Sequence, residues 1–299
     1  MEITITGGTG FLGKQLIASL VSAQHSVRVL GRSPKTGLTR AAQVFLWDAL
    51  QGDPPPDSLA GATAVVHLAG EPVAQRWTPE AKRRIRETRI QGTRRLVSAF
   101  SRMAKPPSVL ISASAIGFYG SRGDEVLTES SGPATGFLAE VCRDWEAEAD
   151  RAEALGVRVV KLRIGVVLGV GGGALAQLLP PFKMFIGGQV GSGEQWMSWI
   201  HLDDVIGLIR FAMETPSLEG AVNATAPNPV RNADFTRVLA RTLRRPALFT
   251  VPAKALTVLF GEMAEMLLGS QRALPAAAER AGYKFSYPDL GPALKNLLS

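Results

Sequence analysis

The sequence predicts an α/β protein: a doubly wound parallel sheet joined to a smaller, mostly helical C-terminal cap. Through the first 224 residues, short runs of β-branched and apolar residues alternate with longer segments of helical periodicity. This alternation is typical of a parallel sheet with helices on both faces. The strand runs are almost continuously apolar, as burial on both faces of a sheet requires. After residue 168 the chain becomes rich in glycine and then reads mainly as helices, which predicts the cap.

Seven segments have the composition of buried strands, and helical segments separate them. The predicted strands are Ile3–Thr6, Val27–Leu30, Val44–Trp47, Ala64–Leu68, Val109–Ala113, Arg158–Ile164 and Ala221–Ala224. The predicted helices are Phe11–Ala23, Pro79–Met103, Phe137–Leu155, Asp203–Met213, Asp234–Leu243, Ala253–Leu268 and Pro288–Leu298. Between residues 169 and 193, repeated glycines and the pair Pro180-Pro181 predict long loops.

The length of 299 residues suggests two domains. We assign residues 1–168 to a nucleotide-binding domain and residues 169–200 and 227–299 to the substrate or cap domain. Because the strand at 221–224 is expected to return to the sheet, residues 201–226 are assigned to the first domain.

Composition excludes several classes of protein. A hydrophobic content of 46% is too high for a disordered chain. The single cysteine, Cys142, excludes an internal disulfide framework, and His25, His67 and His201 lie too far apart for a histidine-rich metal motif, so no metal site is expected. The net charge of +7 allows nucleic acid, anionic membranes or phosphorylated ligands as partners and selects none of them.

Targeting and membrane segments are not expected. The N-terminus reads as a strand, and it lacks the basic and apolar regions of a signal peptide. Glu262 and Glu265 interrupt the most apolar late stretch, so it reads as a surface helix and not as a membrane span. We therefore expect a soluble, cytoplasmic protein with no membrane partner.

The strongest motif is a glycine pattern that follows the first predicted strand and opens the first predicted helix. Gly7 provides a tight turn, Gly10 lets a pyrophosphate approach the backbone, and Gly13 lets the helix pack on the strand. The other members of the motif are Thr9, Phe11 and Leu12. The helix N-terminus offers free N–H groups to phosphates. A plain glycine-rich turn is the alternative, but this context favours a dinucleotide site on a Rossmann-type sheet.

The end of the second predicted strand distinguishes between cofactors. An NAD site has an acid there to bind the ribose 2′-hydroxyl, but this chain has Arg32 and Ser33 instead. An arginine can bind a 2′-phosphate, so NADP(H) is the predicted cofactor, with a solvated loop charge as the alternative. Asp48, after the third strand, either binds the adenine amino group or caps a turn. Small residues in Leu68-Ala69-Gly70 let the chain pass close to the cofactor.

Taken together, these segments resemble the extended short-chain dehydrogenases/reductases. The resemblance extends through Ser112-Ala113-Ser114 and Phe118-Tyr119-Gly120. Further segments are similar to the YfcH-like nucleoside-diphosphate-sugar epimerases, which carry a C-terminal domain of unknown function. These segments are Gly70-Glu71-Pro72, Arg76-Trp77, 89–93, Trp145-Glu146, 163–169, Trp199-Ile200-His201, 223–227, Asn232, Asp234-Phe235, Gly282-Tyr283 and 285–288. The resemblance covers essentially the whole chain. It implies the fold and an NADP(H) cofactor, with Ser112, Arg89 and Val166 beside it.

One departure from this superfamily concerns catalysis. The resemblance implies a serine, a tyrosine and a lysine four residues after the tyrosine, in which the lysine lowers the pKa of the tyrosine base. Ser114 (or Ser112) matches the serine, but Phe137 stands at the tyrosine position and Val141 at the lysine position. No tyrosine of this chain is followed by lysine at that spacing. The usual general base is therefore missing.

Three residues are candidates for the catalytic role: Ser114, Tyr119 and Glu71. Tyr119 is the only tyrosine of the predicted nucleotide domain, and core packing is its alternative role. Glu71 follows the fourth predicted strand, at the edge where doubly wound sheets bind ligands, and an ion pair with Arg76 is its alternative. Cys142 is not expected to be a nucleophile.

Candidate substrate residues lie around the predicted junction with the cap. Trp196 and Trp199 have the rings to stack on a base or sugar, Gln189 has an amide to hydrogen-bond it, and Arg163 has a charge to meet an anionic substrate. The alternative for the tryptophans is packing between domains. His201 precedes Asp203-Asp204, which predicts a helix that starts here and is capped by an acid. We expect His201 to belong to a hydrogen-bond network at this helix start, in preference to a catalytic role.

A basic stretch from Lys82 to Arg95 holds seven Lys or Arg residues, so nucleic-acid binding has to be considered as a function. Glu87, Ile85 and Ile90 interrupt the charges, so a solvated helix face with Arg89 turned inward is favoured, and no nucleic-acid partner is expected.

Two functions remain. The first is an NADP(H)-dependent epimerase or oxidoreductase acting on a small hydroxyl or carbonyl compound, with a nucleotide sugar implied by the resemblance. The second is a non-catalytic NADP(H)-binding sensor or scaffold. We expect a small-molecule substrate and a monomer or homodimer.

Overall fold

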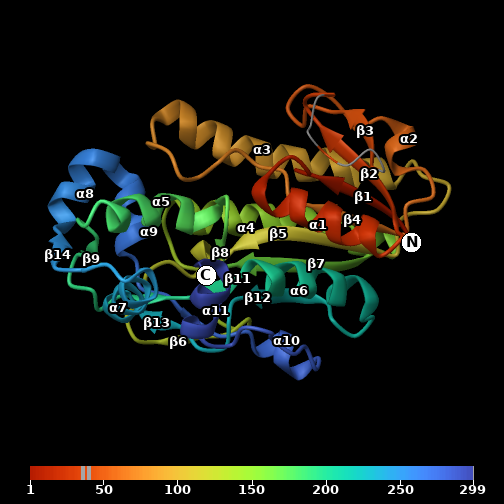
Figure 1. Ribbon diagram of the computed structural model, residues 1–299. Coiled ribbons are helices and arrows are strands. Elements are labelled where there is room, and N and C mark those ends of the chain that lie inside the picture. Colours follow the sequence, from red (N-terminus) through yellow and green to blue (C-terminus); the bar gives the residue numbers. More distant parts are fainter. Residues whose placement is uncertain (35–37, 39–41, 299) are drawn as a thin grey trace.

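A parallel sheet forms the centre of the protein. The computed structural model describes residues 1–34, 38 and 42–298, and within these residues seven strands form the sheet in the order β12-β7-β5-β4-β1-β2-β3 (Figure 1). The strands are β1 (Glu2–Thr6), β2 (Ser26–Gly31), β3 (Ala42–Leu46), β4 (Ala64–His67), β5 (Val109–Ala115), β7 (Arg158–Ile164) and β12 (Gly220–Ala224). All neighbours pair in parallel, which confirms the predicted doubly wound fold.

Helices cover both faces of the sheet. On one face, α1 (Phe11–Ser22) and α6 (Leu202–Glu214) enclose an apolar core that includes the fully buried Ile5, Leu16 and Leu208. On the other face, α3 (Pro79–Phe100) and α4 (Phe137–Asp150) pack together, with Leu96 and Phe100 buried against the sheet. Burial of each such side chain stabilises the fold by about 1.5–3 kcal/mol.

The strand order places a groove at the end of β1. β1 lies between β2 and β4, so the strands that follow it in the chain are added first on one side of β1 and then on the other. The point where the strand order reverses is a switch point, and in doubly wound sheets ligands bind there, beyond the carboxyl ends of the strands. In the register, Thr6 pairs with both Leu30 and His67. The segments after β1, β2 and β4 therefore emerge at one edge of the sheet.

Figure 1 shows α8, α9 and β14 at the left, at the cap end of the molecule, whereas α2 lies at the right beside β2 and β3. The remaining elements complete the fold. They are α2 (Pro56–Leu59), β6 (Val126–Leu127), β8 (Val166–Gly169), α5 (Gly173–Lys183), β9 (Gly188–Val190), β10 (Trp196–Met197), β11 (Trp199–His201), β13 (Val230–Arg231), α7 (Asn232–Leu243), β14 (Phe249–Val251), α8 (Ala253–Phe260), α9 (Ala264–Leu268), β15 (Arg272–Ala273), α10 (Ala276–Arg280) and α11 (Leu290–Leu298), with short 3₁₀ turns at Ile116–Tyr119, Glu153–Leu155 and Gly261–Met263. Four two-stranded pairs join them: β8 with β11, β9 with β14, β10 with β13 and β6 with β15.

Two predictions about the cap were wrong. The segment that holds Pro180 and Pro181 is the end of helix α5 and not a loop. The two prolines lie in the last turn of α5, which ends at Lys183, and their carbonyls accept the N–H groups of Met184 and Ile186 just beyond the helix. The helix predicted over Ala253–Leu268 is divided by Gly261, whose φ of +62° is incompatible with a right-handed helix.

The predicted return of the chain to the sheet is confirmed, because β12 pairs with β7 over residues 220–224. The domain boundaries at residues 168, 200 and 226 stay a prediction. Among the described residues, no helix is both long and apolar enough to cross a membrane.

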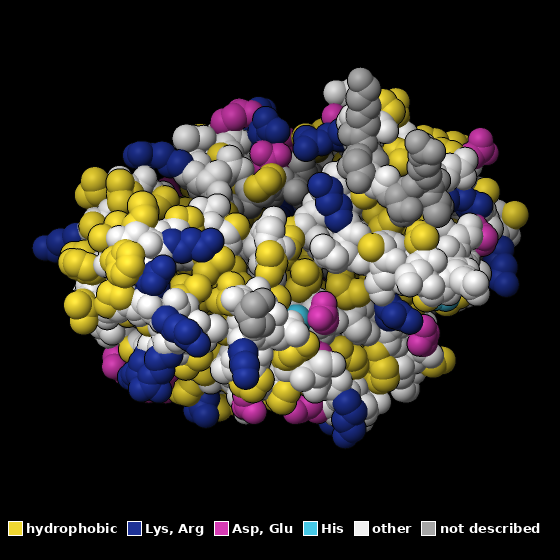
Figure 2. Space-filling model, in the orientation of Figure 1, with side chains coloured by type: hydrophobic (Ala, Val, Ile, Leu, Met, Phe, Trp, Pro, Cys, Tyr) yellow, Lys and Arg dark blue, Asp and Glu magenta, His cyan; other side chains and the backbone are white. Residues whose placement is uncertain are grey.

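Hydrophobic side chains gather on the surface at the cap end, with Lys and Arg side chains between them (Figure 2). Exposed members include Phe185 at the end of α5, Leu248 and Phe249 at β14, and Val258 and Leu259 of α8. The cap is thus more apolar on its surface than the sheet end of the molecule.

Candidate cofactor site and reaction centre

The glycine motif forms a backbone cradle after β1. Gly7 has a φ of +72°, and a Cβ atom on it would lie 2.6 Å from the carbonyl carbon of Leu68. A Cβ atom on Gly13 would lie 2.3 Å from the Gly7 oxygen, so α1 reaches this close approach to the turn only with glycine. Gly10 is the N-cap residue of α1 and supplies no side-chain hydrogen bond. The first N–H groups of α1 are therefore left for an anion, which fits a pyrophosphate.

The other members of the motif are placed differently. Thr9 is exposed in the turn, and Leu12 packs against the core beneath α1. The ring of Phe11 lies against the turn between β8 and α5, where a Cβ atom on Gly172 would be 2.4 Å from the ring. Phe11 thereby joins the cradle to the start of the cap.

A cavity of about 410 Å³ lies beyond the ends of β2 and β3. Its lining residues are Arg32, Leu46, Trp47, Asp48, Gln51, Gly52 and Asp53. Arg32 is exposed, and Ser33 is exposed beside it. One Asp48 oxygen accepts the Leu50 N–H at 2.9 Å, which shows the turn-capping role. Since Asp48 also lines the cavity with Arg32, the adenine role stays a prediction.

His67, at the end of β4, forms hydrogen bonds to β1 and to α3. Its Nδ1 lies 2.6 Å from the Thr6 hydroxyl and its Nε2 2.9 Å from the Thr93 hydroxyl. Thr6 accepts the Ala69 N–H, and Thr93 donates to the Arg89 carbonyl, so the network fits a neutral imidazole that donates from Nε2. Burial, together with the Arg89 charge, lowers the pKa of His67 from 6.5 to about 4. This histidine is structural, and through Thr6 it is linked to the backbone of Ala69 in the segment Leu68-Ala69-Gly70.

Arg89 reaches from α3 to the floor of the groove. A Cβ atom on Gly70 would lie 2.9 Å from the central carbon of the guanidinium. Nη1 donates to the carbonyls of Glu71 at 2.9 Å and Ile85 at 3.1 Å, and the group lies over the Trp145 ring at 5.1 Å. The inward turn expected for Arg89 is thus the observed position.

Apolar residues occupy the place of the missing tyrosine and lysine. Phe137 packs on Trp77, with ring centroids 5.2 Å apart, and the Lys82 ammonium lies 5.1 Å from the Phe137 ring. Val141 is buried. Burial raises the pKa of the neighbouring Cys142 thiol to about 11, so that it stays protonated near neutral pH. Positions 137 and 141 of α4 therefore supply neither a general base nor a cation.

The serine and tyrosine candidates belong to one buried network. Ser114 donates to Glu146 at 2.6 Å, and Arg163 binds both oxygens of the same carboxylate at 2.9 and 2.8 Å. Arg163 also donates to the Tyr119 hydroxyl at 2.9 Å, which in turn donates to Asn223 at 2.7 Å. The network connects β5, α4, β7 and β12 beneath the groove.

This network argues against two of the expected roles. Tyr119 has no exposed surface, and its hydroxyl already donates and accepts; burial raises the pKa of Tyr119 above its usual value. Arg163 lies in β7 and not in the cap, and its charge is neutralised by Glu146. Both side chains are therefore structural. Ser114 is 3% exposed, and its proton is held by Glu146.

Glu71 forms an ion pair, but with a different partner from the one expected. One of its oxygens lies 3.2 Å from Nη2 of Arg84, and not near Arg76. Its N–H is held by the Thr88 hydroxyl at 3.0 Å. The carboxylate consequently turns toward α3, at the rim of the groove. Ser112 is buried in β5, where it pairs with His67 of β4. Val166 is half-buried in β8, where it pairs with Trp199 and packs against the core of the cap.

The aromatic and histidine candidates are mostly used in packing. Trp199 has no exposed surface and donates to the Asn228 carbonyl, so it is not available to stack on a ligand. His201 is buried, stacks on Tyr287 at 3.9 Å, and itself caps α6 by accepting the Asp203 N–H. The cap residue is thus the histidine and not an acid. Trp196 is half-buried between Arg231 and Arg272, each 4.5 Å from its ring.

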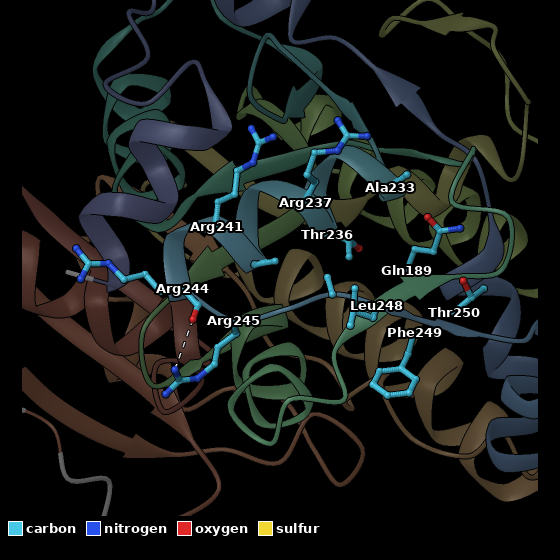
Figure 3. A pocket seen from close by; sticks show the side chains of 12 residues that line it. Gln189, Ala233, Thr236, Arg237, Arg241, Arg244, Arg245, Leu248, Phe249 and Thr250 are labelled. Carbon is cyan, nitrogen blue, oxygen red and sulfur yellow. Dashed lines mark hydrogen bonds between the residues drawn. The ribbon is translucent and has the colours of Figure 1, made fainter.

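Gln189 lies in a second, larger cavity of about 530 Å³ on the outside of the cap, away from the cofactor groove. This cavity lies between α7 and β14, and Arg237, Arg241, Arg244 and Arg245 line it. Figure 3 shows that these four guanidinium groups point in different directions. They do not converge on one point, so the cavity is not built as a phosphate pocket.

Sequence reasoning missed Glu146 and Asn223, which hold the buried network together. An arginine inside a strand that is buried on both faces requires a buried acid. Arg163 in β7 carried that signal, but the sequence did not show which acid is its partner.

The parallel sheet with its uncapped glycine cradle defines a dinucleotide-binding protein of the extended short-chain dehydrogenase/reductase type. The family model described as "NAD dependent epimerase/dehydratase family" matches residues 3–224, and the chain belongs to this family. A domain of unknown function, DUF1731, matches residues 251–297. The resemblance predicted from the motifs is thereby confirmed.

Relatives of similar length support this assignment. The chain is 42% identical to an Arabidopsis thaliana protein named "Epimerase family protein SDR39U1 homolog, chloroplastic", covering 100% of this chain and 87% of the relative. It is 37% identical to Bacillus subtilis epimerase family protein YfhF, covering 100% and 98%. Among solved structures, human epimerase family protein SDR39U1 with NADPH has a TM-score of 0.88 at 32% identity, covering 100% and 99%.

Proposed function

We propose that this protein is an NADP(H)-dependent epimerase or oxidoreductase that acts on a small hydroxyl or carbonyl compound. The observation that carries this proposal is the placement of Arg32 and Asp48 in one cavity beside the glycine cradle. In this arrangement the cradle holds the pyrophosphate, and Arg32 holds the 2′-phosphate by charge-assisted hydrogen bonds. The human relative is described with NADPH, which supports the same cofactor here.

The bound cofactor would supply the hydride chemistry. This chain's residues would hold the cofactor and exclude water at the apolar surface made by Trp77, Phe137 and Val141. Of the three catalytic candidates, Glu71 is the one whose carboxylate lies at the rim of the groove, with 14% of its side chain exposed. We assign it the task of holding a substrate hydroxyl. A nucleotide sugar, a cytoplasmic location and a monomer or homodimer are further parts of the proposal.

A non-catalytic NADP(H)-binding sensor or scaffold is the second candidate. The apolar residues at positions 137 and 141 favour it, together with a Tyr119 hydroxyl fully engaged in the buried network. The two candidates share the cofactor site and differ only in turnover.

The first experiment is calorimetric titration of NADPH and NADH into the wild type and Arg32→Asp. We expect NADPH to bind more tightly than NADH, and Arg32→Asp to weaken NADPH about tenfold or more, because hydrogen bonds to charged groups contribute ~1.5–3 kcal/mol. Arg122→Asp is the control, since the Arg122 side chain pairs with Glu125 on the surface. Unchanged NADPH affinity in Arg32→Asp would show that this arginine does not select the cofactor.

The second experiment mixes the NADPH complex with carbonyl compounds, and the NADP⁺ complex with alcohols and nucleotide sugars. Absorbance at the reduced nicotinamide band reports net transfer, and sugar analysis reports epimerisation. Turnover that is lost in Glu71→Gln supports the enzyme and the role of Glu71. Tight cofactor binding without turnover across the panel favours the sensor, and absence of any binding contradicts both candidates.

A further inference from the structure

The cofactor groove has two unlike halves. The cradle after β1 lies between the cavity at the ends of β2 and β3, which fits the adenosine half, and the ends of β4 and β5 on the other side. A dinucleotide with its pyrophosphate in the cradle must extend both ways across this switch point. The nicotinamide half therefore falls over the end of β4, where Gly70 is the exposed surface.

Directly beneath this surface lies the Arg89 guanidinium. Gly70 lets the guanidinium lie close to the groove, because a Cβ atom at this position would be only 2.9 Å from its central carbon, shorter than van der Waals contact. Two backbone carbonyls, those of Glu71 and Ile85, fix one amino group of the arginine. The position of the charge is thus set by the backbone and not by a mobile ion pair.

Arg89 has no carboxylate partner in the part of the chain that the structure describes. The nearest candidate, Glu71, gives its carboxylate to Arg84. The other neighbours of the guanidinium are the Trp145 ring and the protonated Cys142 thiol. The Glu71 charge acts on the guanidinium from a distance, but the Glu71 carboxylate forms its ion pair with Arg84. A partly buried cation that no carboxylate binds directly exerts a field that solvent and salt screen only weakly.

At position 141 of the facing helix α4, Val141 stands where the resemblance implies a lysine, and the cation of α4, Arg143, is exposed and pairs with Asp144. In this chain the positive charge at this end of the groove comes from α3 instead. Arginine cannot lose its proton in the physiological range, so this charge is permanent.

We propose that Arg89 makes the cofactor site selective for the reduced form, NADPH over NADP⁺. The oxidised nicotinamide ring carries a positive charge and the reduced ring is neutral, so the fixed guanidinium repels only the oxidised form. This inference rests on the proposed function, since it requires that the groove binds the cofactor. It concerns the redox state that the site retains, and it holds whether the protein is an enzyme or a sensor.

The test compares the dissociation constants of NADPH and NADP⁺, measured by calorimetry, for wild type, Arg89→Met, Arg89→Lys and Arg83→Met. We expect the wild type to bind NADPH at least about tenfold more tightly than NADP⁺, from one unit charge acting over a few ångströms at an effective dielectric constant near 20. Arg89→Met should bring the ratio close to one, while Arg89→Lys should keep most of it. Arg83, on the exposed side of the same helix and paired with Glu80, is the control that leaves the ratio unchanged.

Several results would overturn the inference. One is a wild type that binds NADP⁺ as tightly as NADPH, a measurement that needs no variant. Another is an Arg89→Met protein in which both affinities fall equally, which is the behaviour of a residue that only supports the backbone. If Arg89→Met does not fold, Arg89→Gln keeps an N–H donor for the carbonyls without the charge, and an unchanged ratio in it would overturn the inference as well. Loss of all cofactor binding in the wild type would instead contradict the proposed function.

Discussion

The two ends of the cofactor groove are built on different physical principles. At the cradle the backbone forms the site: Gly7 and Gly13 let the turn, β4 and α1 approach within distances that no side chain permits, while a Cβ atom on Gly10 would lie 3.2 Å from the Gly7 oxygen. At the other end, side chains from α3, α4, β5, β7 and β12 meet in hydrogen-bond networks. The three glycines of the cradle lie within seven consecutive residues, 7–13, whereas the residues joined at the other end are up to 104 positions apart.

The difference shows which part of the site is open to change. A cradle defined by missing side chains tolerates almost no substitution, because any added atom collides with the backbone. At the other end, the phenol and ammonium implied by the resemblance are replaced by Phe137 and Val141, and the fold keeps its buried serine and arginine. The pocket for a cofactor can therefore persist while the chemistry beside it varies.

The largest effect is expected from breaking the buried network beneath the reaction end. Arg163→Met leaves the Glu146 carboxylate buried without its partner, which should lower the free energy of unfolding by about 3–5 kcal/mol. Urea unfolding measures the loss. Arg122→Met removes an exposed ion pair and should leave the midpoint unchanged. A small loss in Arg163→Met would mean that the network does not stabilise this end of the groove.

A second effect should appear on acidification. His67 has a pKa near 4 in the folded protein against 6.5 for the free side chain, so the unfolded chain binds the extra proton between these values. Stability should therefore be complete above pH 6.5 and fall by about 3 kcal/mol as the pH drops toward 4. Unfolding curves at several pH values measure this slope. His67→Gln should remove that component, His25→Gln should not, and equal slopes in all three proteins would contradict the neutral buried imidazole.

The cradle itself is tested by adding one carbon atom. Gly13→Ala places a Cβ atom where the Gly7 oxygen stands, so α1 must move away from the turn. NADPH binding should weaken by about 100-fold or more, equivalent to ~2.7 kcal/mol. Gly132→Ala is the matched control, because its Cβ atom would meet nothing within 4 Å. Titration calorimetry decides, and retained affinity in Gly13→Ala would show that the cradle is not the phosphate site.

The smallest effect concerns the two helix starts on either side of the groove. Helix α3 is capped by Thr78, whose hydroxyl accepts the Ala81 N–H at 3.1 Å, while α1 begins at Gly10 without a side-chain cap. Thr78→Ala should cost about 1 kcal/mol of stability without changing NADPH affinity. Thermal unfolding and calorimetry on the same samples separate the two quantities. If Thr78→Ala changes NADPH affinity but not stability, the start of α3 contributes to cofactor binding and not to stability, which would contradict this assignment.

The sequence predicted the sheet well and the cap less well, for a physical reason. Buried parallel strands need continuous apolar runs, and Arg158–Ile164 was predicted with the bounds of β7 itself. The cap uses strands of two or three residues such as β14 and β15, which carry too few residues for any periodicity. Pro180 and Pro181 predict a loop by composition, but they lie in the last turn of α5. Their carbonyls accept backbone hydrogen bonds there, and residue type does not reveal such bonds.

The sequence by itself determined the doubly wound fold, the glycine cradle and the absence of the usual tyrosine and lysine, because each depends on residue type at a short spacing. Only the tertiary structure decided which candidate side chains are available. It enclosed Tyr119 and Arg163 in a network with Glu146, used Trp199 and His201 for packing, and placed Gln189 on the far side of the cap. It also put Arg89 beneath Gly70. Burial and charge pairing arise from segments far apart in the chain, so they become visible only once these segments have been brought together.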